Sequence, residues 1–186
     1  MSVLLVRYVV DTSHSTVPLP ALDAEPPPVE DRVYGMPMFP TLPTADLAAS
    51  VGFWTRGLGF VELFSIPGHL VHLRRWRFQD VLLVLGEPPA APPPGTLSVA
   101  CVPRQLEEVA AACEALRPGS TSGPERRPWN SVDLHVVTPE RARVVCTAVL
   151  PLDSGAARDL RAVGVDAPPV TPSTSWRRPD RGGVGC

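Results

Sequence analysis

Apolar side chains in the stretch 39–64 recur first at helical spacing and then at alternating spacing. The first group has intervals of three or four residues, which is typical of one helix face: Leu47, Val51, Trp54 and Leu58. Asp46 stands directly before this group and can accept hydrogen bonds from the first backbone N–H groups of a helix. Gly57 and Gly59 supply the permissive backbone that ends a helix. The alternation that follows predicts a strand at Phe60–Ser65.

The second half of the chain repeats this order of elements. A predicted strand at Thr96–Val102 leads into Pro103, a residue favoured in the first turn of a helix. One apolar face runs through the residues that follow: Leu106, Val109, Ala110, Cys113 and Leu116. They predict a helix at Pro103–Leu116. The segment Gly119–Arg127 is poor in β-forming residues, so the strand expected there is short or absent. A terminal hairpin is expected from Ser131–Thr138 and Arg143–Val149.

The first half is expected to contain one helix and four strands, in the order strand Val33–Leu42, helix Asp46–Arg56, and strands Phe60–Ser65, Leu70–Trp76 and Val81–Leu85. The proline-rich segment Gly86–Gly95 is read as a semi-rigid connector. Together these elements predict an α+β domain at 33–149, built from two tandem βαβββ modules at 33–85 and 96–149.

Two extensions flank this domain. Residues 1–32 are expected to form an N-terminal extension with a strand at Val3–Val10 and a proline-rich tether at Val17–Val29. Residues 150–186 are read as a largely disordered tail. Within it a short helix is expected from Ser154 to Val163, and disorder from Asp166 onward.

Composition excludes several functions. The formal net charge of −2 gives no basis for binding nucleic acid. All 17 basic residues are arginine, so neither a Schiff-base lysine nor a phosphate-loop lysine is available. No apolar run reaches membrane-spanning length, and the start lacks the features of a secretory signal. The cysteines are widely spaced, which favours buried thiols in a reducing cytoplasm: Cys101, Cys113, Cys146 and Cys186.

Several of these residues carry a resemblance to a known family. Phe39-Pro40, Asp46, Phe53-Trp54 and Leu58-Gly59-Phe60 together resemble the first half-module of the glyoxalase/bleomycin-resistance (vicinal oxygen chelate) superfamily. The likeness is greatest to the metal-free bleomycin-binding resistance proteins. It implies that the two modules form a curved mixed sheet with a cleft. It also implies a homodimer, since Pro40 matches the proline at which the family's first strand crosses between subunits.

A second block strengthens the resemblance. Ser122-Gly123-Pro124 followed by Pro128-Trp129 is similar to the segment of the bleomycin-binding proteins whose tryptophan lines the drug groove. Asn130 stands where that family usually has glycine, and the turn Thr138–Ala142 departs from the family's Asp-Pro-x-Gly-Asn sequence.

The resemblance also implies where a metal would bind. Enzymes of the superfamily hold a divalent metal with His and Glu side chains on the first and last strands of each half. Phe39 and the predicted strands at Val81–Leu85, Thr96–Val102 and Arg143–Val149 offer no His, Asp or Glu. We therefore expect no metal, no other cofactor and no catalytic residue of the family's kind.

Aromatic residues and a few polar ones are the candidate ligand-binding residues. The expected groove is lined by Phe64, Trp76 and Trp129, with Phe39 at its floor. His72 or Asp133 is expected to supply the polar group that orients the ligand. The plainer interpretation is a solvated hairpin at Arg74–Asp80 whose aromatic residues cover the sheet. His72 and His135 are the candidates for an acid/base pair, although ordinary strand histidines are the commoner case.

The leading hypothesis is a metal-free protein that binds or sequesters a flat aromatic or amphipathic small molecule, for instance an antibiotic, as a cytoplasmic homodimer. One alternative is a metal-independent isomerase or lyase that uses His72, His135 or Asp133. The other is a non-catalytic accessory homodimer. No nucleic-acid or membrane partner is expected.

Overall fold

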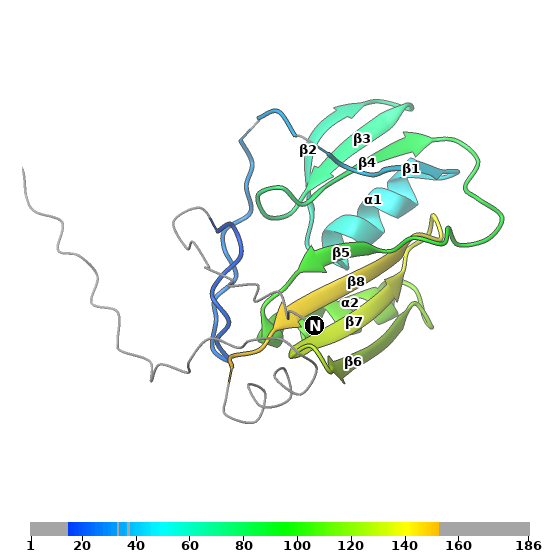
Figure 1. The fold of residues 1–186 in the computed structure, drawn as a ribbon. Coiled ribbons are helices and arrows are strands. Elements are labelled where there is room, and N and C mark those ends of the chain that lie inside the picture. Colours follow the sequence, from blue (N-terminus) through cyan, green and yellow to red (C-terminus); the bar gives the residue numbers. More distant parts are fainter. Residues whose placement is uncertain (1–14, 33, 37, 153–186) are drawn as a thin grey trace, which may run out of the picture. The chain divides into compact units, whose positions relative to one another are not determined.

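A computed structural model describes residues 15–32, 34–36 and 38–152 of the 186-residue chain. The strand expected at Val3–Val10, the short helix expected from Ser154 and the expected disorder after Asp166 lie outside these residues. Figure 1 shows the described part as two groups of strands, each with one helix against it.

The first module contains β1 (Thr41–Thr44), α1 (Leu47–Arg56), β2 (Val61–Ile66), β3 (Leu70–Arg74) and β4 (Asp80–Leu85). Its four strands form a sheet in the order β1-β4-β3-β2. The central strand pairs are antiparallel, whereas β1 runs parallel to β4. A parallel neighbour needs a long crossover, and α1 with the β2–β3 hairpin provides it.

The second module repeats the plan with β5 (Leu97–Ala100), α2 (Pro103–Leu116), β6 (Thr121–Arg127), β7 (Ser131–Val137) and β8 (Arg143–Val149). Its sheet has the corresponding order β5-β8-β7-β6, again with its first strand parallel to its last. The predicted α+β class and the two tandem βαβββ modules are confirmed.

Two strand predictions need correction. The first strand is shorter than expected and begins at Thr41, because only Thr41–Thr44 is in register with β4. The segment expected to hold a short strand or none forms β6, which runs for seven residues. Its pairing with β7 supplies the hydrogen bonds that its residue types do not favour, with a register shift between Ser122 and Glu125.

Each helix packs against one face of its sheet. The opposite face of each sheet has no helix on it and is called the uncovered face. Asp46 caps α1 by accepting a hydrogen bond from the Ala49 backbone N–H at 2.9 Å. Alternating residues of β3 and β7 enter a single core cluster beneath the helices: Val71, Leu73, Leu134 and Val136. Their neighbours His72 and His135 therefore lie on the uncovered faces.

The proline-rich N-terminal segment packs against the modules. Residues 15–32 contain no helix or strand. Glu25 forms an ion pair with Arg104 of α2, and the Glu30 backbone N–H donates to the Arg75 carbonyl at 3.2 Å. The expected extended tether is thus held at several points along its length.

Gly57 is needed for packing and not for an unusual backbone conformation. Its φ of −87° is ordinary helical geometry, whereas Gly59 has a φ of +73° and makes the turn. A Cβ atom at Gly57 would lie 2.7 Å from the Phe53 carbonyl oxygen and 3.0 Å from Cys113 Sγ of α2. The absence of a side chain here lets the end of α1 approach α2.

Gly57→Ala should therefore destabilise the protein by about 1–3 kcal/mol, as overpacking does. The matched control is Gly52→Ala, where the added Cβ meets only the flexible end of Arg56. That change should stabilise the helix by about 0.5–1 kcal/mol, because alanine loses less backbone entropy than glycine. Urea unfolding measures both, and a Gly57→Ala protein as stable as the parent would contradict the packing argument.

Candidate functional site

A buried ion pair organises the uncovered face of the first module. Arg74 on β3 donates from Nε to Asp80 Oδ1 at 2.7 Å and from Nη2 to Asp80 Oδ2 at 2.6 Å. Both side chains have no exposed surface. The hydrogen bonds to Asp80 raise the pKa of Arg74, so Arg74 stays positively charged. His72 Nε2 lies 2.7 Å from Asp80 Oδ2. Because that carboxylate oxygen accepts, the His72 Nε2 carries the proton.

The segment before β1 closes over this pair. Arg74 Nη1 donates to the Arg32 carbonyl at 2.7 Å, and the Tyr34 ring stacks 3.8 Å from the Arg74 guanidinium carbon. Tyr34 Oη in turn accepts from the Phe78 backbone N–H at 2.8 Å. Arg74 is fully buried and donates three hydrogen bonds within the protein, so it is not a free anion-binding group.

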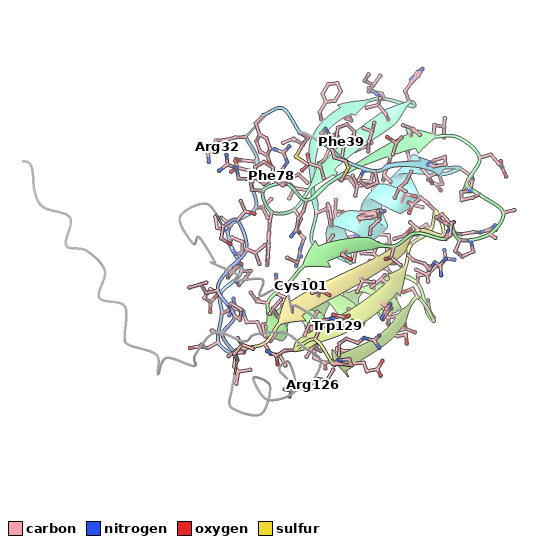
Figure 2. All side chains as sticks on the ribbon, viewed as in Figure 1. Arg32, Phe39, Phe78, Cys101, Arg126 and Trp129 are labelled. Atoms are coloured by element: carbon pink, nitrogen blue, oxygen red, sulfur yellow. The ribbon has the colours of Figure 1, made fainter. Side chains whose placement is uncertain are left out.

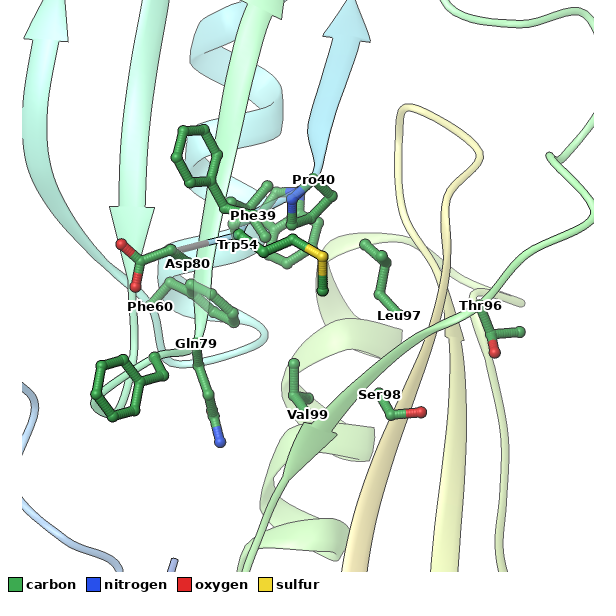
Figure 3. Close-up of a pocket in the computed structure, with 13 residues that line it drawn as sticks. Phe39, Pro40, Trp54, Phe60, Gln79, Asp80, Thr96, Leu97, Ser98 and Val99 are labelled. Carbon is green, nitrogen blue, oxygen red and sulfur yellow. The ribbon is translucent and has the colours of Figure 1, made fainter. Parts of the chain in front are cut away.

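Beside the ion pair lies a cavity of about 500 Å³ between the β1 and β4 strands and β5. It is lined by Met38, Phe39, Pro40, Trp54, Phe60, Phe78, Gln79, Asp80, Val81, Thr96, Leu97, Ser98 and Val99. Figure 3 shows Leu97 and Val99 pointing from β5 toward Trp54 and Phe60, while the Ser98 hydroxyl points away. The interior of the cavity is thus mainly aromatic and aliphatic.

The uncovered face of the second module carries a separate polar network. Asp133 Oδ1 accepts from Ser131 Oγ at 2.9 Å and from Thr147 Oγ1 at 2.5 Å. Arg127 Nη2 lies 2.6 Å from His135 Nε2, and Arg127 Nε lies 3.5 Å from Asp133 Oδ2. Since a guanidinium can only donate, His135 accepts at Nε2 and is neutral.

The predicted ligand-binding residues do not line one groove within the chain. Phe39 lines the cavity, and its ring centroid lies 5.4 Å from that of His72. Phe64 is paired with His72 across β2 and β3 and is 55% exposed. Trp76 is only 2% exposed and lines a different cavity, beneath the prolines at 26–28.

Trp129 and Asp133 belong to the second module. Trp129 is 62% exposed at the turn between β6 and β7, and Figure 2 shows it well away from Phe39. His72 and His135 occupy equivalent positions of the two modules, each two residues before a hairpin end. Each ring is bonded within its own module, so the structure does not show them as an acid/base pair.

Sequence reasoning missed Gln79 and Asp80 on the cavity wall. The available signal was the opposite charges of Arg74 and Asp80 at the two ends of a hairpin. The register pairs these residues directly across β3 and β4. Cross-strand neighbours of opposite charge stabilise a sheet, and burial strengthens their attraction. The plainer interpretation described the Arg74–Asp80 hairpin as solvated, but both ends of this hairpin lie in the protein interior.

The residues present do not fit a divalent metal at the positions that the resemblance implies. On the uncovered faces of β1, β4, β5 and β8, which are the first and last strands of each module in chain order, Asp80 is the one carboxylate among the described residues. Both of its oxygens already accept from Arg74. Nowhere in the described ranges do three His, Cys, Asp or Glu side chains gather closely enough to hold a metal ion. We derive no chemistry through a metal.

The described cysteines are buried, as predicted, but their surroundings differ. Burial raises the pKa of Cys113 to about 12. The Cys146 thiol, and then the nearby Arg75 guanidinium, lower the pKa of Cys101 to about 7. Arg75 Nη1 lies 3.3 Å from Cys101 Sγ. The surroundings of Cys101 thus favour its thiolate form, whereas burial disfavours that of Cys113.

Comparisons with known proteins establish the fold. Fosfomycin resistance protein FosX from Listeria monocytogenes, complexed with Mn(II) and sulfate, aligns with a TM-score of 0.54 at 11% identity over 71% of this chain and 99% of that chain. A glyoxalase-related enzyme from Fulvimarina pelagi aligns with a TM-score of 0.51 at 16% identity, covering 59% and 85%. FosX from Mesorhizobium loti gives 0.50 at 11% identity, covering 63% and 93%.

These likenesses show that the chain shares the two-module fold of these proteins, which is the fold that the resemblance implied. No protein-family model and no curated protein matches the sequence. Neither helix that the structure describes has the length and apolarity to cross a membrane.

Removing Asp80 should leave the buried Arg74 charge without a partner. Asp80→Ala is therefore expected to lower the free energy of unfolding by about 3–5 kcal/mol, measured by urea denaturation. The double variant Arg74→Met/Asp80→Leu, which removes both charges, should recover most of that loss. Arg104→Gln is the control, because its ion pair with Glu25 is exposed and should contribute little. An exposed ion pair contributes at most ~1 kcal/mol. If Asp80→Ala lowered the free energy of unfolding by no more than that ~1 kcal/mol, the Arg74–Asp80 pair would not be the buried, stabilising ion pair described above.

Proposed function

We propose that this protein is a metal-free small-molecule binding or sequestering protein of the glyoxalase/bleomycin-resistance type. Its ligand is a flat aromatic or amphipathic molecule held in the cavity beside Asp80. The observation that carries the proposal is the cavity of about 500 Å³ with aromatic walls from Phe39, Trp54, Phe60 and Phe78.

The size and chemistry of this cavity support binding. Small-molecule sites commonly enclose roughly 300–1,000 Å³ and combine apolar walls with a few polar groups. Trp54 and Phe60 pack edge to face with ring centroids 5.0 Å apart. Trp54 Nε1 also donates to Glu140 Oε2 at 3.2 Å, across to the second module. The rings at the back of the cavity are thus held rigidly, which lowers the entropic cost of binding.

The structural neighbours support the same class of function more weakly. Two of them are named as fosfomycin resistance proteins, and they share the fold of this chain at 11% identity. An antibiotic is therefore one reasonable ligand for the cavity, although fold alone does not define function. The cytoplasm is the compartment in our proposal, because the described cysteines form no disulfide.

Two observations favour other functions. Asp80 orients the His72 ring through a hydrogen bond, as a carboxylate orients a histidine that acts as a general base. This arrangement supports a metal-independent isomerase or lyase. Exposed apolar residues on the uncovered sheet faces, such as Phe64 and Ile66, support an accessory homodimer. Small-molecule binding remains the better proposal, because the cavity alone is sufficient for it.

Ligand binding should depend on the free volume next to β5. A panel of natural products is screened by thermal shift, and a ligand present at 100 times its Kd should stabilise the protein by about 2.7 kcal/mol. Leu97→Trp fills the cavity and should abolish that shift. Leu85→Trp makes the same change at an exposed site on β4 outside the cavity and should preserve it. An equal shift in both variants would place the ligand elsewhere.

We also propose that the protein is a homodimer that covers these apolar sheet faces. Multi-angle light scattering at micromolar concentration should report twice the chain mass. Phe64→Asp should shift the protein toward the monomer, because it places a charge in an apolar interface. Leu22→Asp alters a still more exposed apolar residue, which lies in the N-terminal segment, and should leave the mass unchanged. A monomeric parent protein would reject the proposed dimer.

A further inference from the structure

One wall of the cavity is made from two separate pieces of the chain. Met38, Phe39 and Pro40 come from the segment before β1, and residues 78–81 come from the turn after β3 and the start of β4. Strand pairing joins the two pieces only from Pro40 onward, where the Leu82 backbone N–H donates to the Pro40 carbonyl at 3.0 Å. The position of the turn relative to the segment before Pro40 therefore depends on other contacts.

Tyr34 makes the contact between the segment and the turn. Its hydroxyl oxygen accepts a hydrogen bond from the Phe78 backbone N–H at 2.8 Å, and the two rings pack edge to face with centroids 5.5 Å apart. The Arg74 guanidinium carbon lies 3.8 Å from the centre of the Tyr34 ring. Because Arg74 is fixed by its hydrogen bonds to Asp80, Tyr34 is anchored to β3 at the same time as it holds the turn.

The backbone conformation of Phe78 explains why the turn needs this contact. Its φ is +67°, which lies in the left-handed region that a bulky side chain seldom adopts. Phe78 is the third residue of a four-residue turn that is closed by a hydrogen bond from the Gln79 N–H to the Trp76 carbonyl. Glycine is the usual residue where that position has a positive φ. Phenylalanine here is strained, and the hydrogen bond to Tyr34 offsets part of the strain.

We propose that Tyr34 is a positioning residue of the ligand cavity, because its hydroxyl holds Phe78 in the left-handed conformation and so fixes the turn as a cavity wall. This inference rests on the proposed binding function and adds a means of regulation to it. Without the hydrogen bond, Phe78 relaxes to a negative φ, the wall moves and ligand binding weakens. Since Tyr34 lies in the segment before β1, attachment of that segment and ligand binding strengthen each other.

The test measures binding of an uncharged aromatic probe, N-phenyl-1-naphthylamine, whose fluorescence increases in apolar surroundings. Fluorescence titration of the full chain gives its Kd. Tyr34→Phe keeps the ring and removes only the hydroxyl, so it should weaken binding about fivefold, the scale of one hydrogen bond. Thr121→Val is the control, because it also removes one hydroxyl, which donates to Glu114 at 3.0 Å outside the cavity. It should leave the Kd unchanged.

A double-mutant cycle distinguishes positioning from a general loss of packing. Phe78→Gly removes the strain, since glycine adopts a positive φ readily, and the Kd of this variant is the new reference. In that background Tyr34→Phe should have no further effect, because no strained conformation is left to hold. Arg141→Gly is the matched control, because Arg141 has a φ of +64° and does not line the cavity. In the Arg141→Gly background the full effect of Tyr34→Phe should persist.

Amide hydrogen exchange provides a measurement without any ligand. The Phe78 N–H donates to the Tyr34 hydroxyl, and Phe78 is 49% exposed, so its exchange rate reports on this hydrogen bond. The rate measured by NMR should rise about fivefold or more in Tyr34→Phe. Should Phe78→Gly fail to fold, this rate still decides, and an unchanged rate would overturn the proposal.

The outcomes separate this inference from the proposed function. If Leu97→Trp abolishes probe binding while Tyr34→Phe binds as tightly as the parent, the cavity remains the ligand site and the role of Tyr34 is rejected. An equal effect of Tyr34→Phe in the parent and in the Phe78→Gly background would also reject that role. Failure of the parent protein to bind the probe would reject aromatic binding in this cavity and the inference together.

Discussion

The ion pair between Arg74 and Asp80 is the interaction on which the candidate site depends. Two opposite charges without solvent exposure are tolerated only when each satisfies the other. The pair closes the β3–β4 hairpin, and Asp80 also holds His72. Arg74 also donates from Nη1 to the Arg32 carbonyl, and its guanidinium stacks on the Tyr34 ring. The hairpin, the histidine and the segment before β1 are thereby positioned by a single contact.

The same pair gives the adjoining cavity its chemical character. Because the charge of Arg74 is used within the protein, the cavity wall keeps one carboxylate, a few neutral polar side chains and many apolar side chains. Both oxygens of Asp80 accept from Arg74, so the carboxylate best placed to bind a metal is already paired with a buried cation. What the fold retains here is a partly open, mainly apolar cavity with a few polar side chains on its wall. In the function we propose, this cavity recognises its ligand by shape and hydrogen bonding.

Local patterns were good guides to the helices and poor guides to two of the edge strands, β1 and β6. The helix at Pro103–Leu116 and the Asp46 cap of α1 agree with the prediction, because spacing and capping act within one or two turns. The strand β6 was underestimated because its stability comes from β7, a neighbour that residue propensity does not describe. The first strand was overestimated for the corresponding reason, since its length is set by the part that pairs with β4.

By itself, the sequence determined the α+β order of elements, the two-module plan and the aromatic residues near the site, because these follow from short-range periodicity and from motifs. Only the tertiary structure decided which of those residues share a cavity. It buried Trp76 under the proline-rich segment, left Trp129 exposed in the second module and brought Gln79 to the cavity wall. The physical reason is that a cavity is made by side chains from separate strands and loops, and their meeting depends on strand register and on how charges pair across the sheet.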